Sequence, residues 1–122
     1  MATKSEKLQE LLTTLRQNAG DIEASAVVSV EGLMIAGDLP REVGKEKVAA
    51  MSAAMLSIGK RATQELSRGR LTQIYVEGTE GSNLLMAAGD KALLVALARP
   101  NSNLGLVFLE MRQAAEHVAE IV

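Results

Sequence analysis

Residues 43–66 read VGKEKVAAMSAAMLSIGKRATQEL, and the interpretation of the whole chain starts from this stretch. Its apolar residues have helical spacing, but they occupy more than one side of the helix. Ala49, Ala53 and Leu56 fall about 140–200° away from Met51 at ~100° per residue, on the side predicted to meet solvent. The stripe predicted to face the core consists of Val48, Met51, Met55, Ile58, Ala62 and Leu66.

A helix that is apolar all round is usually covered all round, and one small domain has a single core to cover it. The second apolar side is therefore predicted to contact another chain. The alternative is that Ala49 and Ala53 reflect helix propensity alone, because alanine tolerates exposure. Leu56 is not explained in that way. A flank of small residues, where a second helix can approach closely, is formed by Ala50, Ala54 and Ser57.

The composition limits the class of protein. The chain has 122 residues, 48% of them hydrophobic, which is enough for a single domain over residues 1–122 with a core of its own. The net charge of −2, without blocks of like charge, argues against a nucleic-acid or acidic membrane partner. The chain has no Cys, which excludes disulfides and thiolate metal sites and fits a reducing compartment.

The ends and the apolar runs predict a soluble cytoplasmic protein. The N-terminal residues MATKSE are polar and lead into an amphipathic helix, so no secretory signal is expected. No apolar run approaches the ~20 residues of a membrane span.

The flanking segments predict two helices and five strands. A first helix carries an apolar stripe of Leu8, Leu11, Leu12, Leu15 and Ala19, and a last helix runs from Leu104 to Val122. Strands are predicted at 24–30 and 33–36, joined by a hairpin, and at 71–77, 84–88 and 92–98. The run 92–98 is the most uniformly apolar strand and should lie in the centre of the sheet.

The order helix, two strands, helix, three strands, helix predicts an α/β (α+β) fold. The short turns within each group of strands indicate a mainly antiparallel five-stranded sheet with helices on both faces.

The sequence lacks the residue sets that catalysis needs, so we predict no catalytic residue, metal ligand or cofactor site. The only His, His117, has no Cys or second His with which to share a metal. Gly59-Lys60 resembles the end of a phosphate-binding loop, but Ala54 and Arg61 stand where that motif needs Gly and Ser or Thr. Glu77 and Glu80 border a turn, where charged residues serve solubility.

Basic residues gather near the end of the central helix: Lys60, Arg61, Arg68 and Arg70. An Arg presented to a bound nucleotide could act as an arginine finger. The alternatives are cations favoured by the helix macrodipole and ordinary pairing at an interface.

The strand 71–77 contains the only Tyr and begins a group of strands, so it is a candidate for the sheet edge. Pairing two copies of it would join two sheets and bring the two central helices together. The predicted dimer interface is therefore Ala50, Ala54, Ser57, Arg61, Leu71, Gln73 and Tyr75.

Four segments together resemble the roadblock family, which includes the roadblock dynein light chain and the bacterial regulator of the gliding-motility GTPase. They are 27–36 (VVSVEGLMIA), the Ala/Met-rich helix, 74–78 (IYVEG) and 103–106 (NLGL). The resemblance covers nearly the whole chain and implies a profilin-like α/β/α sandwich that homodimerises through its third strand and second helix.

The resemblance also implies a function. Bacterial and archaeal members commonly act on Ras-like small GTPases, as activators or scaffolds, without a nucleotide site of their own, and present their paired second helices to the GTPase. Carried over by position, that surface is Ala49, Ala53, Leu56, Lys60 and Gln64. The extended tail of some regulators is expected to be absent, since the sequence stops at Val122.

Three hypotheses follow. The first is a non-catalytic homodimeric regulator of a small Ras-like GTPase. The second is a dimeric adaptor that tethers other proteins and leaves GTPase kinetics unchanged. The third, a small-molecule enzyme, has the least support, because the chain has one His, no Cys and no convergent polar set.

Overall fold

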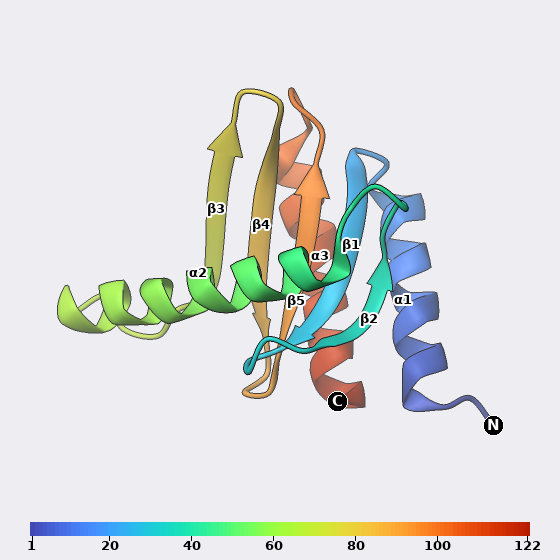
Figure 1. Ribbon diagram of the computed structural model, residues 1–122, viewed down its shortest axis with the longest axis horizontal. Coiled ribbons are helices and arrows are strands. Elements are labelled where there is room, and N and C mark those ends of the chain that lie inside the picture. The colour runs from blue at the N-terminus through green and yellow to red at the C-terminus, as the bar shows by residue number, and fades with distance from the viewer.

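The computed structural model describes residues 1–122, and its helices and strands follow the order predicted from the sequence (Figure 1). Their bounds are α1 Lys4–Asn18, β1 Ile22–Ser29, β2 Met34–Asp38, α2 Lys45–Glu65, β3 Gln73–Gly78, β4 Gly81–Ala88, β5 Ala92–Ala98 and α3 Leu104–Ile121. None of the three helices combines the length and the apolar character needed to cross a membrane.

The five strands form one sheet in the order β2-β1-β5-β4-β3, with every neighbouring pair antiparallel. β5 is therefore the central strand, as its apolar sequence predicts, and all but one of its residues are buried. β2 and β3 form the two edges of the sheet. The edge position predicted for the strand that carries Tyr75 is confirmed.

The helices cover both faces of the sheet, as expected. Figure 1 shows α1 and α3 behind the strands and α2 in front of them. The larger core lies under α1 and α3 and includes Leu12, Leu94 and Met111. A smaller core lies under α2 and includes Leu85 and Val95. The profilin-like α/β/α arrangement is thus present, and α2 forms one layer by itself.

The prediction of which side of α2 faces the core is wrong for most of its residues. Ala49 and Leu56, predicted to meet solvent or a partner, are only 4% and 6% exposed and pack on the sheet. Met51 and Ile58, predicted to face the core, are 56% and 69% exposed. Val48 and Met55, from the same predicted stripe, are partly buried against the smaller core, so the helix is rotated about its axis relative to the prediction.

We predict that Leu56→Ala lowers the free energy of unfolding by about 2–4 kcal/mol, because it opens a cavity between α2 and the sheet. Leu33→Ala removes the same atoms from an exposed position in the turn between β1 and β2. That control should change the free energy by less than about 0.5 kcal/mol. Urea denaturation of both variants at one protein concentration measures the difference, and equal losses would contradict the observed orientation of α2.

Candidate interaction surface

One flank of α2 is apolar and unburied. Met51 and Ile58 are exposed and Met55 is half-buried, and all three lie on the same side of the helix. Leu66, at the C-cap of the helix, is also exposed. Exposed apolar side chains grouped on one flank of a helix are a candidate interaction surface.

The C-terminal end of α2 extends past the sheet. The helix crosses β3 at Gly59, where a Cβ would lie 2.9 Å from Cδ1 of Ile74 and 3.1 Å from Cδ2 of Leu71. Glycine at this position lets the helix approach the edge strand closely. Between Gly59 and the end of α2, Thr63 is the only residue that is half-buried, and the others are exposed. Figure 1 shows the end of α2 projecting beyond β3. The last two turns of the helix therefore lack a sheet beneath them.

Part of the same sheet face has no helix over it. Val76, Asn83 and Leu97 are neighbours in register across β3, β4 and β5 and form the uncovered row. Val76 is 45% exposed, and the other two are half-buried. A cleft of about 260 Å³ lies beside this row, between Met51 and Met55 of α2 and Leu97 of β5. This strip of sheet, apolar at Val76 and Leu97 with Asn83 between them, and the apolar flank of α2 form one continuous surface.

The backbone of β3 offers free hydrogen-bonding groups at the sheet edge. The N–H of Ala87 donates to the carbonyl of Thr72 at 3.2 Å, which fixes the residues of β3 that bond inward to β4. In an antiparallel pair the bonded residues alternate, so Gln73, Tyr75 and Glu77 point their N–H and C=O groups outward. No side chain of the chain hydrogen-bonds to these outward groups. The edge is ready to accept another strand.

The opposite edge of the sheet is protected. The side-chain amide of Gln9 donates to the carbonyl of Gly37 in β2 at 2.8 Å. Arg16 and Asp38 form an ion pair at the end of the same strand, with Nε and Oδ2 2.6 Å apart. The register of β2 against β1 also shifts at a bulge. Side-chain caps, charge and bulges are known devices that block edge-to-edge pairing, so β3 is the available edge.

The predicted interface residues separate into two groups. Leu71 is half-buried under α2, and Gln73 and Tyr75 lie on the exposed edge strand. On α2, the small-residue flank lies on the outer side of the helix, away from the sheet; its residues are Ala50, Ala54, Ser57 and Arg61, all exposed. The expected surface therefore combines the free edge with a side of α2 that points away from it.

The surface carried over for a partner is not a single surface. Ala49 and Leu56 belong to the core, so they are excluded from it. Ala53 is half-buried, and its Cβ is the atom that a Cβ on Gly32 would meet, at 3.2 Å. Lys60 and Gln64 are exposed and line a cleft of about 520 Å³ between α2 and the end of β5. Only these last two remain available to a partner.

The basic residues near the end of α2 are held loosely. Arg61 pairs with Glu65 at 3.4 Å and Arg70 with Asp90 at 3.8 Å, and all four side chains are largely exposed. Exposed pairs of this kind contribute little to stability. Arg68 donates from Nε to the carbonyl of Leu66 at 2.9 Å, which satisfies a free carbonyl at the helix end.

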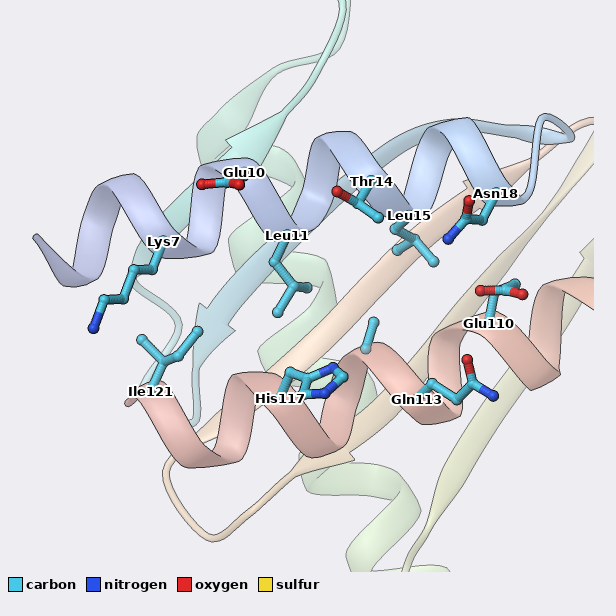
Figure 2. Close-up of a pocket in the computed structure, with 11 residues that line it drawn as sticks. Lys7, Glu10, Leu11, Thr14, Leu15, Asn18, Glu110, Gln113, His117 and Ile121 are labelled. Atoms are coloured by element: carbon cyan, nitrogen blue, oxygen red, sulfur yellow. The ribbon is translucent and has the colours of Figure 1, made fainter. Parts of the chain in front are cut away.

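A second concavity lies on the other face, between α1 and α3 (Figure 2). It has a volume of about 380 Å³, and Figure 2 shows Leu11 and Leu15 of α1 pointing toward α3, where Gln113 and His117 lie along the groove. None of the side chains that line it hydrogen-bonds to another. His117 is thus a helix-surface residue in this groove, and the groove does not join it to a nucleophile.

Comparison with known proteins agrees with this architecture. The family model described as "Roadblock/LC7 domain" matches residues 8–98. The uncharacterized protein MJ1340 of Methanocaldococcus jannaschii is 37% identical over 111 residues, which cover 91% of this chain and 96% of that protein.

Solved structures share the fold. The gliding protein MglB from Thermus thermophilus superimposes with a TM-score of 0.87 at 20% identity and covers 99% of this chain and 92% of its own. Profilin IA of Acanthamoeba castellanii superimposes with a TM-score of 0.61 at 14% identity, covering 89% of this chain and 96% of its own. The profilin-like fold expected from the sequence is confirmed.

Two features of the surface do not follow from the periodicity of the sequence. The first is the close crossing at Gly59, and its signal is a glycine inside a helix, which indicates a close approach of another backbone or side chain. The second is the exposure of Val76, and its signal is an apolar residue on the helix-covered face of an edge strand.

We predict that Gly59→Ala is nearly neutral, whereas Gly59→Leu lowers the free energy of unfolding by about 1–3 kcal/mol. An added Cβ meets only the far ends of the Ile74 and Leu71 side chains, which can move, but a leucine side chain must lift α2 from β3. Ser57→Leu, on the exposed outer side of the helix, is the matched control. Denaturant unfolding that ranks Gly59→Leu no lower than Ser57→Leu would contradict the close crossing.

Proposed function

Because the chain belongs to the Roadblock/LC7 family, we propose that it forms a homodimer that regulates or scaffolds a small Ras-like GTPase. The observation that carries the proposal is that two neighbouring features of the single chain each lack a structural partner. β3 has an unpaired edge, and the end of α2 that crosses this edge has no sheet beneath it. A second copy supplies what each feature lacks.

The outward groups of β3 select one register for the pairing of two copies. A two-fold axis through Tyr75 places Tyr75 opposite itself and Gln73 opposite Glu77 of the partner copy, so that all three outward residues form backbone hydrogen bonds. The same register places Ile74 opposite Val76 of the partner copy on the face that α2 covers. A two-fold axis through Ile74 would place Val76 opposite Thr72 of the partner copy, and an axis through Val76 would place Ile74 opposite Gly78. Each of these registers also leaves one outward residue of β3 without a hydrogen-bonding partner in the other strand. The register centred on Tyr75 is therefore favoured.

The same axis also covers the exposed flank of α2. The helix crosses β3 on the N-terminal side of Tyr75, near Leu71 and Ile74. Rotation about Tyr75 places the helix of the partner copy over the other half of the strand, where the uncovered row begins at Val76. The two helices then run antiparallel, and the flank with Met51 and Ile58 lies between them. Such an exchange removes apolar surface on this flank from water, which favours association.

The outer side of the paired helices remains free for another protein. It carries Ala50, Ala54, Ser57 and Arg61, with Lys60 and Gln64 beside them. Small residues allow another helix or loop to approach closely, and the cations suit an acidic partner surface. We assign the GTPase contact to this side, in place of the buried Ala49 and Leu56.

We propose an allosteric mechanism. A GTPase that binds across the paired helices shifts toward the arrangement of its switch loops that the dimer binds more tightly, and the difference in binding free energy sets the size of the shift. Arg61 lies on the exposed outer side of α2 and forms a loose pair with Glu65 at 3.4 Å, so its substitution, described below, distinguishes an interface residue from an arginine finger. The second candidate function, an adaptor without effect on kinetics, uses the same outer side of the paired helices.

We predict the register of the dimer from cysteine pairing, which is unambiguous because the natural chain has no Cys. Tyr75→Cys should form a disulfide with its own copy on oxidation, since directly opposed residues lie about 5.5 Å apart between Cα atoms, within disulfide range. Gln73→Cys and Glu77→Cys should each stay unlinked alone, but a mixture of the two should form a cross-linked dimer. Non-reducing gel electrophoresis reads the result.

The controls distinguish cross-linking that depends on the register of the paired strands from cross-linking by random collision of exposed cysteines. Glu31→Cys lies in the turn between β1 and β2, exposed and far from β3, and should not cross-link. Gln73→Cys linking with itself as efficiently as Tyr75→Cys would contradict the register, because its two copies should be about 14 Å apart.

The regulatory role is tested with a purified small Ras-like GTPase from the same organism. We expect the wild-type chain to bind it and to change its rate of GTP hydrolysis or nucleotide exchange, and Ala54→Glu on the outer side of α2 to abolish both effects. Arg61→Ala should retain at least a tenth of the rate change if Arg61 is an interface residue, and lose it completely if Arg61 is an arginine finger. Binding without any change in rate would identify the adaptor, and no binding would refute the partner class.

A further inference from the structure

A cleft lies beside the flank of α2 that faces away from the proposed partner helix. It has a volume of about 520 Å³ and is bounded by α2, by the connection from α2 to β3 and by the turn between β4 and β5. Lys60 and Gln64 line it from α2, and Lys60 lies about 160–180° around the helix axis from Ile58 and Met51. One chain therefore forms the cleft, and the proposed pairing places no helix over it.

The floor of the cleft is apolar. Leu56 and Leu93 belong to the smaller core under α2, and Leu71 packs against that core. Leu56 and Leu93 are only 6% and 2% exposed, so packing holds this part of the floor in place. Leu71 is half-buried and borders the cleft from the connection to β3. An aliphatic side chain that enters the cleft would contact these leucines and leave water.

The mouth of the cleft carries more positive than negative charge. Lys60 and Arg70 line it together with one carboxylate, that of Asp90. Lys60 forms no ion pair, and Nη2 of Arg70 lies 3.8 Å from Oδ1 of Asp90, with both side chains more than nine-tenths exposed. Such a pair contributes little to stability, so Arg70 can bind a carboxylate of a ligand instead. The chain as a whole has a net charge of −2, so the positive excess is local to this mouth.

The connection between α2 and β3 supplies unpaired backbone groups at the same mouth. Figure 1 shows it returning from the projecting end of α2 to the edge strand. Neither the N–H nor the C=O of Gly69, Arg70 or Leu71 forms a hydrogen bond within the chain. In the register proposed above, Leu71 lies opposite Thr79 in the β3–β4 turn of the partner copy, so strand pairing extends no further than Leu71. The donors and acceptors of Gly69 and Arg70 therefore stay free in the dimer. A peptide offers both donors and acceptors to them, whereas a simple carboxylate offers acceptors only.

We propose that this cleft binds an extended acidic segment of another protein. One large aliphatic side chain of the segment lies on the leucine floor. Carboxylates beside it pair with Lys60 and Arg70, and its main chain hydrogen-bonds to the backbone of Gly69 and Arg70. Main-chain bonds hold such a segment, whereas the apolar floor and the cations select its sequence. One chain forms the whole cleft, so this binding depends neither on the homodimer nor on a GTPase.

The test measures the binding of a short synthetic peptide, with a central Leu flanked by Glu, to the nitrogen-15-labelled wild-type chain. At millimolar peptide, the backbone amide signals of Gly69 and Arg70 should shift in NMR spectra, because these N–H groups gain acceptors. A matched peptide with Asn in place of Leu should bind at least about five-fold more weakly, because it leaves the apolar floor unfilled.

Octanoate is the control for the peptide groups, since it has a carboxylate and an aliphatic chain but no amides. It should bind at least about five-fold more weakly than the Leu peptide, because it cannot donate to the free carbonyl groups. Octanoate that binds as tightly as the peptide would overturn the assignment of a peptide. Unchanged amide signals of Gly69 and Arg70 at millimolar peptide would overturn the site.

The position of the peptide is tested with charge-reversing variants of exposed residues on α2. Lys60→Glu should weaken peptide binding at least about five-fold, whereas Lys45→Glu, the same change at the other end of the helix, should bind as the wild type does. Ala54→Glu, which blocks the outer side of α2, should leave peptide binding unchanged, so a failure of the GTPase contact is distinguishable from a failure of this site. Equal weakening by the two lysine variants, or loss of binding by Ala54→Glu, would overturn the placement in the cleft.

Discussion

The length and direction of α2 relative to the sheet constrain everything else in this molecule. A helix of 21 residues is about 32 Å long, whereas five strands span about 19 Å between the outer two. Because α2 runs across the strands rather than along them, it cannot stay over one sheet for its whole length (Figure 1). It begins near β1 and β2, crosses β3 at Gly59 and continues beyond the edge of the sheet.

The two edges of the sheet differ in how well they are protected against pairing with another strand. β2 is capped by a side chain of α1, ends in an ion pair and contains a bulge, whereas β3 carries none of these. An edge that is left flat and unpaired beside an apolar helix flank is a liability in a monomer, because it invites aggregation. The combination is consistent with a strand that pairs with one defined partner. In the homodimer that we propose, protection of β2 would limit strand pairing to a closed two-fold contact through β3 rather than an open fibre.

The sequence predicted the elements, their order, the central position of β5 and the edge position of β3, because each depends on local periodicity and on turns. It failed on the orientation of α2. Both sides of that helix are apolar, and the larger residues were assigned to the core. The sheet instead buries Ala49, Ser52 and Leu56, and Val48 and Met55 pack at the margin of the same core. The larger Met51 and Ile58 lie on the flank that a single copy leaves open. Periodicity locates the apolar stripes of a helix, but where a helix has two of them it does not determine which one packs on the sheet.

The consequence for function is that the outer side of the paired α2 helices, which we assign to a GTPase, forms one surface only when two copies pair. This assignment depends on the pairing of β3 with a second copy. Light scattering of the wild-type chain at micromolar concentration tests this pairing most directly. The account predicts a mass of twice the 12.9 kDa of one chain, and a mass of a single chain would contradict it.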